Sequence, residues 1–185
     1  MDVKQFKNVT VFDHPLIKHK ITILRDVNTN AIVFRRVVKE VAILEGYEAL
    51  RDLPTKDIEI ETPIEKTMQP KVESSNILFV PILRAGLGMT DGFMELVPNA
   101  KVGHLGMYRD EVTHEPVEYY NKMPQDLSDK KIYLLDPMFA TGGSAMAAVQ
   151  VLKNRGAKDI SFICIIAAPE GVERFCKVYP DVPVY

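Results

Sequence analysis

Residues 132 to 145 read IYLLDPMFATGGSA and combine one acid with a glycine-rich turn. An apolar run ends in Asp136, and small and hydroxyl-bearing residues follow before a helical pattern begins at Ala145. Where a strand leads through a glycine turn into a helix, the unpaired N–H groups of the first helical turn attract anions. Gly142 and Gly143 carry no Cβ, so the backbone can approach a ligand closely there. The stretch therefore predicts a phosphate site with a carboxylate beside it.

The spacing within this stretch narrows the kind of phosphate ligand. A nucleoside-triphosphate loop needs a lysine after its last glycine, and no lysine follows Gly143. The pair of adjacent glycines also lacks the spacing of the dinucleotide-binding fingerprint. A carboxylate can accept hydrogen bonds from two neighbouring hydroxyls while the turn holds a phosphate. We therefore predict a sugar phosphate, with an ordinary glycine-rich strand–helix turn as the alternative.

Two arginines follow other strand-like segments. Arg84 lies in PILRAGLGM, residues 81–89, after an apolar run, and Arg109 lies in GHLGMYRD, residues 103–110. A guanidinium group can hold phosphate oxygens through two parallel hydrogen bonds. A solvent-exposed surface charge is the alternative interpretation of each arginine alone. Together with Asp136, they place polar groups at three strand ends, which predicts a ligand with more than one phosphate.

The order of apolar patterns predicts the elements that position these residues. Apolar residues recur at helical spacing over 31–51, which indicates one amphipathic helix. From residue 77 onward, strands and helices alternate. We expect strands near 77–83, 101–107, 131–136, 160–167 and 182–185, and helices near 87–96, 143–155 and 170–178. This alternation predicts right-handed βαβ units, and hence an α/β fold with an open parallel sheet and flanking helices.

The remaining segments have weaker patterns. Residues 1–30 form an entry segment with no clear period, and 57–62 alternate as a half-buried strand does. Residues 64–76 are polar and predict a loop. Residues 108–122 contain charges, a proline and three tyrosines, and we expect a protruding hairpin there.

Length, charge and cysteine content bound the class of protein. The 185 residues, 46% of them hydrophobic, fit one domain over 1–185. The net charge of −2 gives no basic surface for nucleic acid, and no apolar run reaches the ~20 residues that span a membrane. Two cysteines outside a C-x-x-C motif and no apolar leader predict a cytoplasmic protein that binds small molecules, without nucleic acid or membrane partners.

Six motifs in chain order resemble uracil phosphoribosyltransferases. They are HPLIKHK (14–20), YEALRDLP (47–54), PILRAGLGM (81–89), EPVEYYNK (115–122), DPMFATGGSA (136–145) and AAPEG (167–171). The resemblance implies the fold of type I phosphoribosyltransferases, with an N-terminal helical segment and a hairpin arm that embraces a second subunit. It also implies a pyrimidine-salvage reaction, in which uracil and phosphoribosyl pyrophosphate give UMP and diphosphate.

The resemblance also implies roles for individual residues. Arg84 and Arg109 would face the diphosphate, and Asp136 and Arg109 would act in catalysis. The ribose 5-phosphate would lie against Asp136, Pro137, Met138, Phe139, Ala140, Thr141, Gly142, Gly143 and Ser144. Mg²⁺ would be held mainly by substrate and water, with no protein cage. A dimer or higher homo-oligomer is implied, and a GTP effector stays open because some family members respond to GTP.

Two alternatives depend on the end of the chain. The family continues past the position of Tyr185 with a loop that holds uracil, and we find no uracil-binding residues within 1–185. The domain is therefore expected to be incomplete at its C-terminal end, with an exposed edge at residues 182–185. The chain could then be a non-catalytic fragment of the enzyme, or a regulator that binds phosphoribosyl pyrophosphate without turnover.

Overall fold

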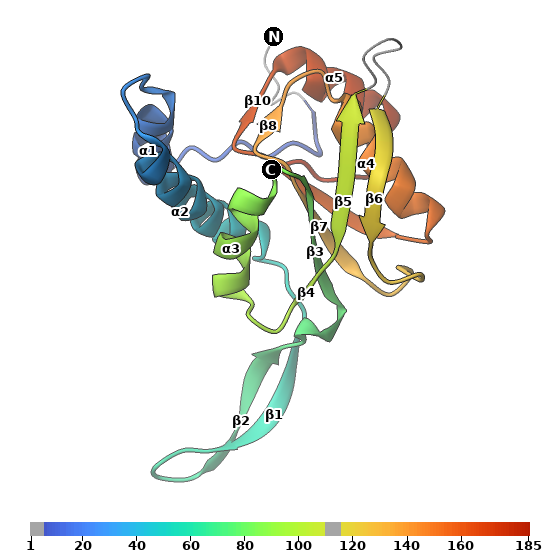
Figure 1. Ribbon diagram of the computed structural model, residues 1–185. Coiled ribbons are helices and arrows are strands. Elements are labelled where there is room, and N and C mark those ends of the chain that lie inside the picture. The colour runs from blue at the N-terminus through green and yellow to red at the C-terminus, as the bar shows by residue number, and fades with distance from the viewer. Residues whose placement is uncertain (1–5, 110–115) are drawn as a thin grey trace.

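The computed structural model describes residues 6–109 and 116–185 and has helices on both faces of a central sheet (Figure 1). The strands of this sheet lie in the order β6-β5-β3-β7-β9. They are β3 (Ile77–Leu83), β5 (His104–Arg109), β6 (Pro116–Lys122), β7 (Lys131–Leu135) and β9 (Asp159–Ile163), with the short β4 (Lys101–Val102) beside β3. All pairs are parallel except β5 with β6. The predicted open, mainly parallel sheet is confirmed.

Alternate residues of β3 point to opposite faces, and both faces are buried. Leu78 and Val80 pack into one apolar core, while Ile77 and Phe79 pack into the other. A strand covered on both sides must be apolar throughout, which explains why ILFVPIL shows no polar alternation. The first core lies under α4 (Gly143–Asn154) and α5 (Pro169–Val178). The second lies under α2 (Ala31–Ala49) and α3 (Leu87–Leu96).

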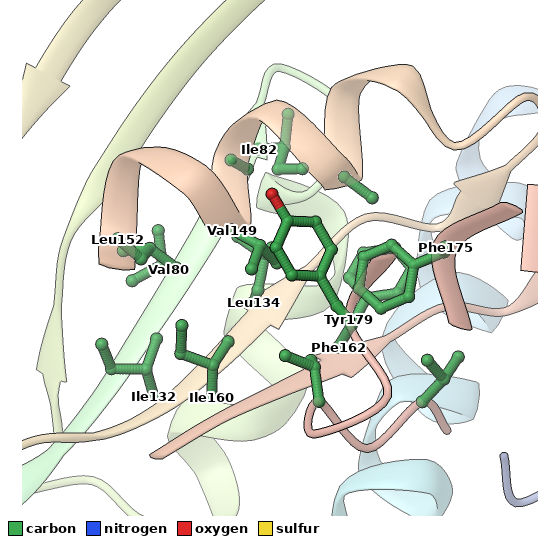
Figure 2. Close-up of a cluster of buried hydrophobic side chains, with 14 of the residues drawn as sticks. Val80, Ile82, Ile132, Leu134, Val149, Leu152, Ile160, Phe162, Phe175 and Tyr179 are labelled. Atoms are coloured by element: carbon green, nitrogen blue, oxygen red, sulfur yellow. The ribbon is translucent and has the colours of Figure 1, made fainter. Parts of the chain in front are cut away.

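Figure 2 shows the first of these cores at close range. Val149 and Leu152 of α4 lie over Val80 of β3, and all three side chains are fully buried. The rings of Phe162 and Phe175 lie 5.8 Å apart, and Tyr179 packs against Phe175. This packing holds α4 in place over the sheet, so the start of α4 has a defined position beside the end of β7.

The entry segment contains a helix that the apolar pattern did not predict. Helix α1 (Pro15–Arg25) begins at a proline, and the His14 Nδ1 accepts a hydrogen bond of 3.1 Å from the Leu16 N–H. Proline at the first helical position and a side-chain acceptor before it are ordinary N-terminal signals. The dipeptide His14-Pro15 could therefore have located this helix.

The protruding hairpin lies elsewhere than predicted. Strands β1 (Thr55–Glu61) and β2 (Lys66–Val72) pair in antiparallel fashion and extend away from the body (Figure 1). The prediction of a loop over 64–76 was therefore wrong, apart from its ends and the short η2 (Ser74–Asn76). The strand predicted at 57–62 exists, but Ile60 is 37% exposed because the hairpin has no layer over it.

The hairpin predicted at 108–122 is part of the central sheet. Strand β6 pairs with β5 from Arg109↔Pro116 to His104↔Lys122 and forms the edge of the sheet. Residues 110–115, between the two strands, lie outside the described residues. The hairpin expected here is therefore confirmed as an antiparallel pair, but its described strands belong to the central sheet.

The C-terminal residues are paired on both sides. The N–H of Phe162 donates to the Pro183 carbonyl at 2.8 Å, and the N–H of Cys164 donates to Tyr185 at 2.9 Å. On the other side, the Thr10 N–H donates to the Val184 carbonyl at 2.8 Å. The prediction of an exposed edge at 182–185 was wrong, because the N-terminal segment covers it.

Candidate functional site

Three neighbouring parallel strands end at one edge of the sheet. Strand β3 lies between β5 and β7, with Leu83 opposite Gly106 and Pro81 opposite Leu135. Arg84 and Asp136 follow the carboxyl ends of β3 and β7, and Arg109 is the last residue of β5. Open α/β sheets bind ligands at this edge. The fold thus brings together the backbone of three positions that lie far apart in the sequence.

Asp136 is a partly buried carboxylate at this edge, directly after the end of β7. Its own N–H donates to the Ile163 carbonyl at 3.1 Å, which continues the pairing of β7 with β9 past the strand end. Burial raises the pKa of Asp136 to about 6, and the Met138 N–H, 3.5 Å from Oδ1, acts in the opposite direction. The group is therefore mainly ionised at neutral pH and can accept hydrogen bonds from hydroxyls.

The turn after Asp136 is anchored by a second, two-stranded sheet. Strand β8 (Met138–Phe139) pairs in parallel with β10 (Ile166–Ala167), and the Phe139 side chain is buried. Gly142 has a φ of 80° and precedes α4, whose first amides have no side-chain cap among the described residues. The predicted phosphate turn therefore has the expected local form, an uncapped helix start after a left-handed glycine. The side chains of Thr141 and Ser144 are both exposed there.

Gly171 on α5 supports this turn from behind and was not recognised as a site residue. A Cβ at this position would lie 2.0 Å from the Ala140 carbonyl oxygen, so no larger residue fits without a shift of the backbone. The motif AAPEG therefore supplies the contact that holds residues 139–142 in place. In the sequence the only available signal was a glycine in the first turn of a predicted helix.

Gly86 plays the same part for the turn that carries Arg84. A Cβ on Gly86 would lie 2.3 Å from the Leu135 carbonyl oxygen, one residue before Asp136. This close contact brings the Arg84 turn against the end of β7. Arg84 itself is exposed, and the peptide bond between Leu83 and Arg84 is cis. The Arg84 side chain is therefore open to solvent at the edge where β7 ends.

Metal ligands and membrane spans were also sought in residues 6–109 and 116–185. No three side chains of His, Cys, Asp or Glu gather there in a way that could hold a metal ion. Within the same residues, no helix has the length and apolar character needed to cross a bilayer.

Comparison with known proteins gives one consistent family. A family model described as uracil phosphoribosyltransferase matches residues 11–185. A uracil phosphoribosyltransferase of Agathobacter rectalis is 57% identical over 177 residues, which are 96% of this chain and 85% of the relative. One from Streptococcus uberis is 55% identical over 175 residues, 95% of this chain and 84% of the relative.

A solved structure agrees with the computed fold. The AQ2163 protein from Aquifex aeolicus is 38% identical to this chain and superposes with a TM-score of 0.90. The match covers 95% of this chain and 84% of the other. The arrangement of sheet, helices and protruding hairpin is therefore that of a known structure across nearly the whole of this chain.

Proposed function

Because the chain belongs to the uracil phosphoribosyltransferase family, we propose that it converts uracil and phosphoribosyl pyrophosphate to UMP and diphosphate. In this reaction a uracil ring nitrogen forms a bond to the anomeric carbon of the ribose. The bond from that carbon to the diphosphate oxygen breaks, and the ring nitrogen loses its proton. The chain is thus a pentosyltransferase of pyrimidine salvage.

The observation that carries this proposal is the convergence of three strand ends. Arg84, Arg109 and Asp136 are brought to one edge by neighbouring parallel strands. A ligand bound there meets a carboxylate and an uncapped helix start, with two arginines on adjacent strands. Phosphoribosyl pyrophosphate needs this combination, because it carries ribose hydroxyls between a 5-phosphate and a diphosphate.

Asp136 is assigned to the ribose. Its carboxylate would accept hydrogen bonds from the two ribose hydroxyls and offset positive charge that develops on the ring as the diphosphate leaves. With a pKa of about 6, most Asp136 side chains are ionised at pH 7 and above. The enzyme's task is then to position two substrates and stabilise charge, without a covalent intermediate on the protein.

The turn from Pro137 to Ser144 is assigned to the 5-phosphate. The backbone N–H groups at the start of α4 follow the glycine turn and have no side-chain cap among the described residues, so they would hold the phosphate oxygens. The exposed hydroxyls of Thr141 and Ser144 would add hydrogen bonds. Arg84 and Arg109 would stabilise charge on the leaving diphosphate.

We propose that Mg²⁺ is held mainly by oxygen atoms of the substrate and water, and less by the protein. The donors at this edge fit such a site, because Asp136 supplies a carboxylate there and the described residues contain no group of three metal-ligating side chains. When bound, Mg²⁺ neutralises diphosphate charge, and it usually keeps several water ligands. Asp136 is the residue that would hold it, directly or through water.

We also propose how the protein assembles with a second copy of itself. The hairpin β1–β2 extends from the body, and Ile64 at its tip is 94% exposed, so we assign it to contact with a second copy of the chain. A GTP effector and a cytoplasmic location stay predictions.

Two measurements on this chain test the proposal. Calorimetry with Mg²⁺ and phosphoribosyl pyrophosphate measures binding, and chromatography of UMP after addition of uracil measures turnover. We expect both to be positive. Binding without UMP would favour the regulator or the fragment over the enzyme, and the absence of both would overturn the assignment of the Asp136 edge.

A further inference from the structure

A cavity lies outside the predicted site and shares none of its residues. It has a volume of about 340 Å³ and is lined by residues of the N-terminal segment, α1, α2, the β9–β10 connection, β10, α5 and the C-terminal residues. Small-molecule sites commonly begin at about 300 Å³. The cavity is therefore large enough for a small ligand, and segments far apart in the chain form its walls.

Glu45 of α2 is a buried acid in the wall of this cavity. The residue is 3% exposed, and its Oε2 has no hydrogen-bond partner among the described residues. A buried polar atom without a partner is rare in folded proteins, because nothing offsets the loss of its water. A ligand that donates a hydrogen bond to this oxygen would remove that cost.

The rest of the lining is mostly apolar and partly aromatic. Ile17 and Val172 are buried in the walls, and the rings of Phe12 and Tyr185 stack 5.9 Å apart at an angle of 24°. Apolar walls suit a hydrocarbon body, and aromatic rings attract a cation near their faces. The cavity therefore offers a surface for an apolar body together with one point of negative charge when Glu45 is ionised.

Among the residues given for the lining, no positive charge balances Glu45. The other titratable groups there are Lys18 of α1, Cys164 and Tyr185. Lys18 forms an ion pair with Asp13, and its side chain is 67% exposed. Burial raises the pKa of both Cys164 and Tyr185, so these two groups are neutral at pH 7. A cation that enters the cavity would supply the missing partner, whereas an anion would be repelled.

We propose that this cavity binds a small primary amine with an apolar body. The ammonium group donates a hydrogen bond to the Glu45 Oε2 and forms an ion pair with the carboxylate. The hydrocarbon body lies against the apolar walls. Positive charge on the ligand distinguishes this site from the Asp136 edge, which is assigned to phosphates. The proposal concerns binding alone and does not rest on the proposed transferase activity.

The burial of Glu45 gives this binding a dependence on pH. Burial raises the pKa of Glu45 well above its usual value, which favours a neutral carboxyl in the unliganded protein. Binding of an ammonium ion then requires that the carboxyl proton be released to solvent. An alkyl ammonium group keeps its charge up to about pH 10. The affinity should therefore rise between pH 5 and pH 8, as Glu45 becomes ionised.

Matched ligands test the charge preference on the unchanged protein. The probes are cyclohexylmethylamine and cyclohexylmethanol, which share one ring but carry an ammonium group or a hydroxyl. Calorimetry at pH 8 should show at least about tenfold tighter binding of the amine, since a charge-assisted hydrogen bond replaces a neutral one. Its affinity should be lower at pH 5. Equal affinities for the two compounds, no binding of the amine, or an amine affinity independent of pH would overturn the proposal.

Matched variants test the role of Glu45. Glu45→Gln keeps the shape of the side chain without its negative charge, and it should lose the preference for the amine. Glu48→Gln is the control, because it removes the same charge from α2 outside the cavity lining, where Glu48 pairs with Arg51. This variant should keep the preference. Circular dichroism confirms that each variant folds. A folded Glu45→Gln protein that still prefers the amine about tenfold would remove Glu45 from the site.

Discussion

Asp136 and Glu45 are both carboxyl groups withdrawn from water, but the protein surrounds them differently. Asp136 follows a strand, and a backbone N–H lies 3.5 Å from its Oδ1. Burial raises the pKa of Asp136 to about 6. Glu45 lies in the middle of a helix among apolar side chains, and its Oε2 has no partner among the described residues. Burial therefore leaves Asp136 mainly ionised at neutral pH, whereas it favours the neutral form of Glu45.

The surroundings also differ in rigidity. Backbone contacts at Gly86 and Gly171 fix the turns beside Asp136, and these contacts leave no room for a Cβ. Glu45 instead borders a cavity of about 340 Å³ that is lined by residues of several segments far apart in the chain. Fixed backbone contacts suit a site that must position two substrates, because small displacements of the reacting groups lower the reaction rate strongly.

The largest expected effect tests the Asp136 side of this comparison. Asp136→Asn keeps the shape but removes the negative charge, and UMP formation should fall by about 10²-fold or more. Asp159→Asn is the control, because Asp159 lies at the opposite end of neighbouring β9 and pairs with Lys131 at the surface. Steady-state assays of both variants decide this. Near-normal turnover of Asp136→Asn would end its assignment to the ribose.

Gly171→Ala tests whether backbone contact positions the phosphate turn. The added Cβ would collide with the Ala140 carbonyl oxygen, so we expect a loss of about 1–3 kcal/mol in the free energy of unfolding. Affinity for phosphoribosyl pyrophosphate should fall with it. Urea denaturation and calorimetry measure the two effects.

Gly88→Ala is the matched control for that change. A Cβ on Gly88 meets a side chain of α2, Val38 Cγ1, at 3.2 Å and no backbone atom. Its stability should stay within about 1 kcal/mol of the parent, since alanine is the better helix former. Equal losses in the two variants would mean that the Gly171 contact has no special role.

Glu45→Leu should stabilise the unliganded protein, by about 1–3 kcal/mol at pH 8, because an unpartnered buried acid is removed. The pKa of Glu45 is raised in the folded chain, so the folded state binds this proton more tightly than the unfolded state. The contribution of Glu45 to the free energy of unfolding is therefore greatest below about pH 4.5, the ordinary pKa of a glutamate, and it declines as the pH rises.

The gain from Glu45→Leu should accordingly be small at pH 4 and larger at pH 8. Urea denaturation at both values measures it, with Glu48→Leu as the control that should show no such trend. A gain that is independent of pH would mean that the titration of Glu45 differs little between the folded and unfolded chain.

The smallest effect separates the two acids directly. Carbon-detected NMR should show Asp136 titrating with a midpoint of about 6 and Glu45 titrating at a pH above the usual range of a glutamate side chain. Asp136→Asn and Glu45→Gln identify the two signals by their disappearance. If both Asp136 and Glu45 titrated with the usual midpoints of exposed carboxyl groups, the difference between their two environments would be disproved.

Much of the Asp136 edge could be predicted because its signals are local. A run of apolar residues, an acid and a glycine turn occupy adjacent positions from Ile132 to Ser144, and their order indicates strand, turn and helix. The parallel order of strands then follows from the alternation of elements. The close contacts of Gly86 and Gly171 could not be foreseen, since each partner lies in another segment.

The helical pattern of α2 was predicted, but the significance of Glu45 was missed. Its buried residues include Val38, Val41, Ala42 and Glu45, so the acid lies four residues after Val41 on the inner face. Phe34, expected on that face, is 43% exposed. The spacing alone could have indicated a buried acid, although not a cavity, which depends on where the chain termini lie.

The sequence alone determined the strand–turn–helix unit at Asp136. Its signals, the period of the apolar residues and the position of the glycines, act between residues close together in the chain. The position of the protruding hairpin, the pairing of residues 183–185 with the N-terminal segment and the isolation of Glu45 depended on the folded structure. These features arise from contacts between segments up to the full length of the chain apart. Burial and electrostatic environment follow from such contacts and from no single stretch of residues.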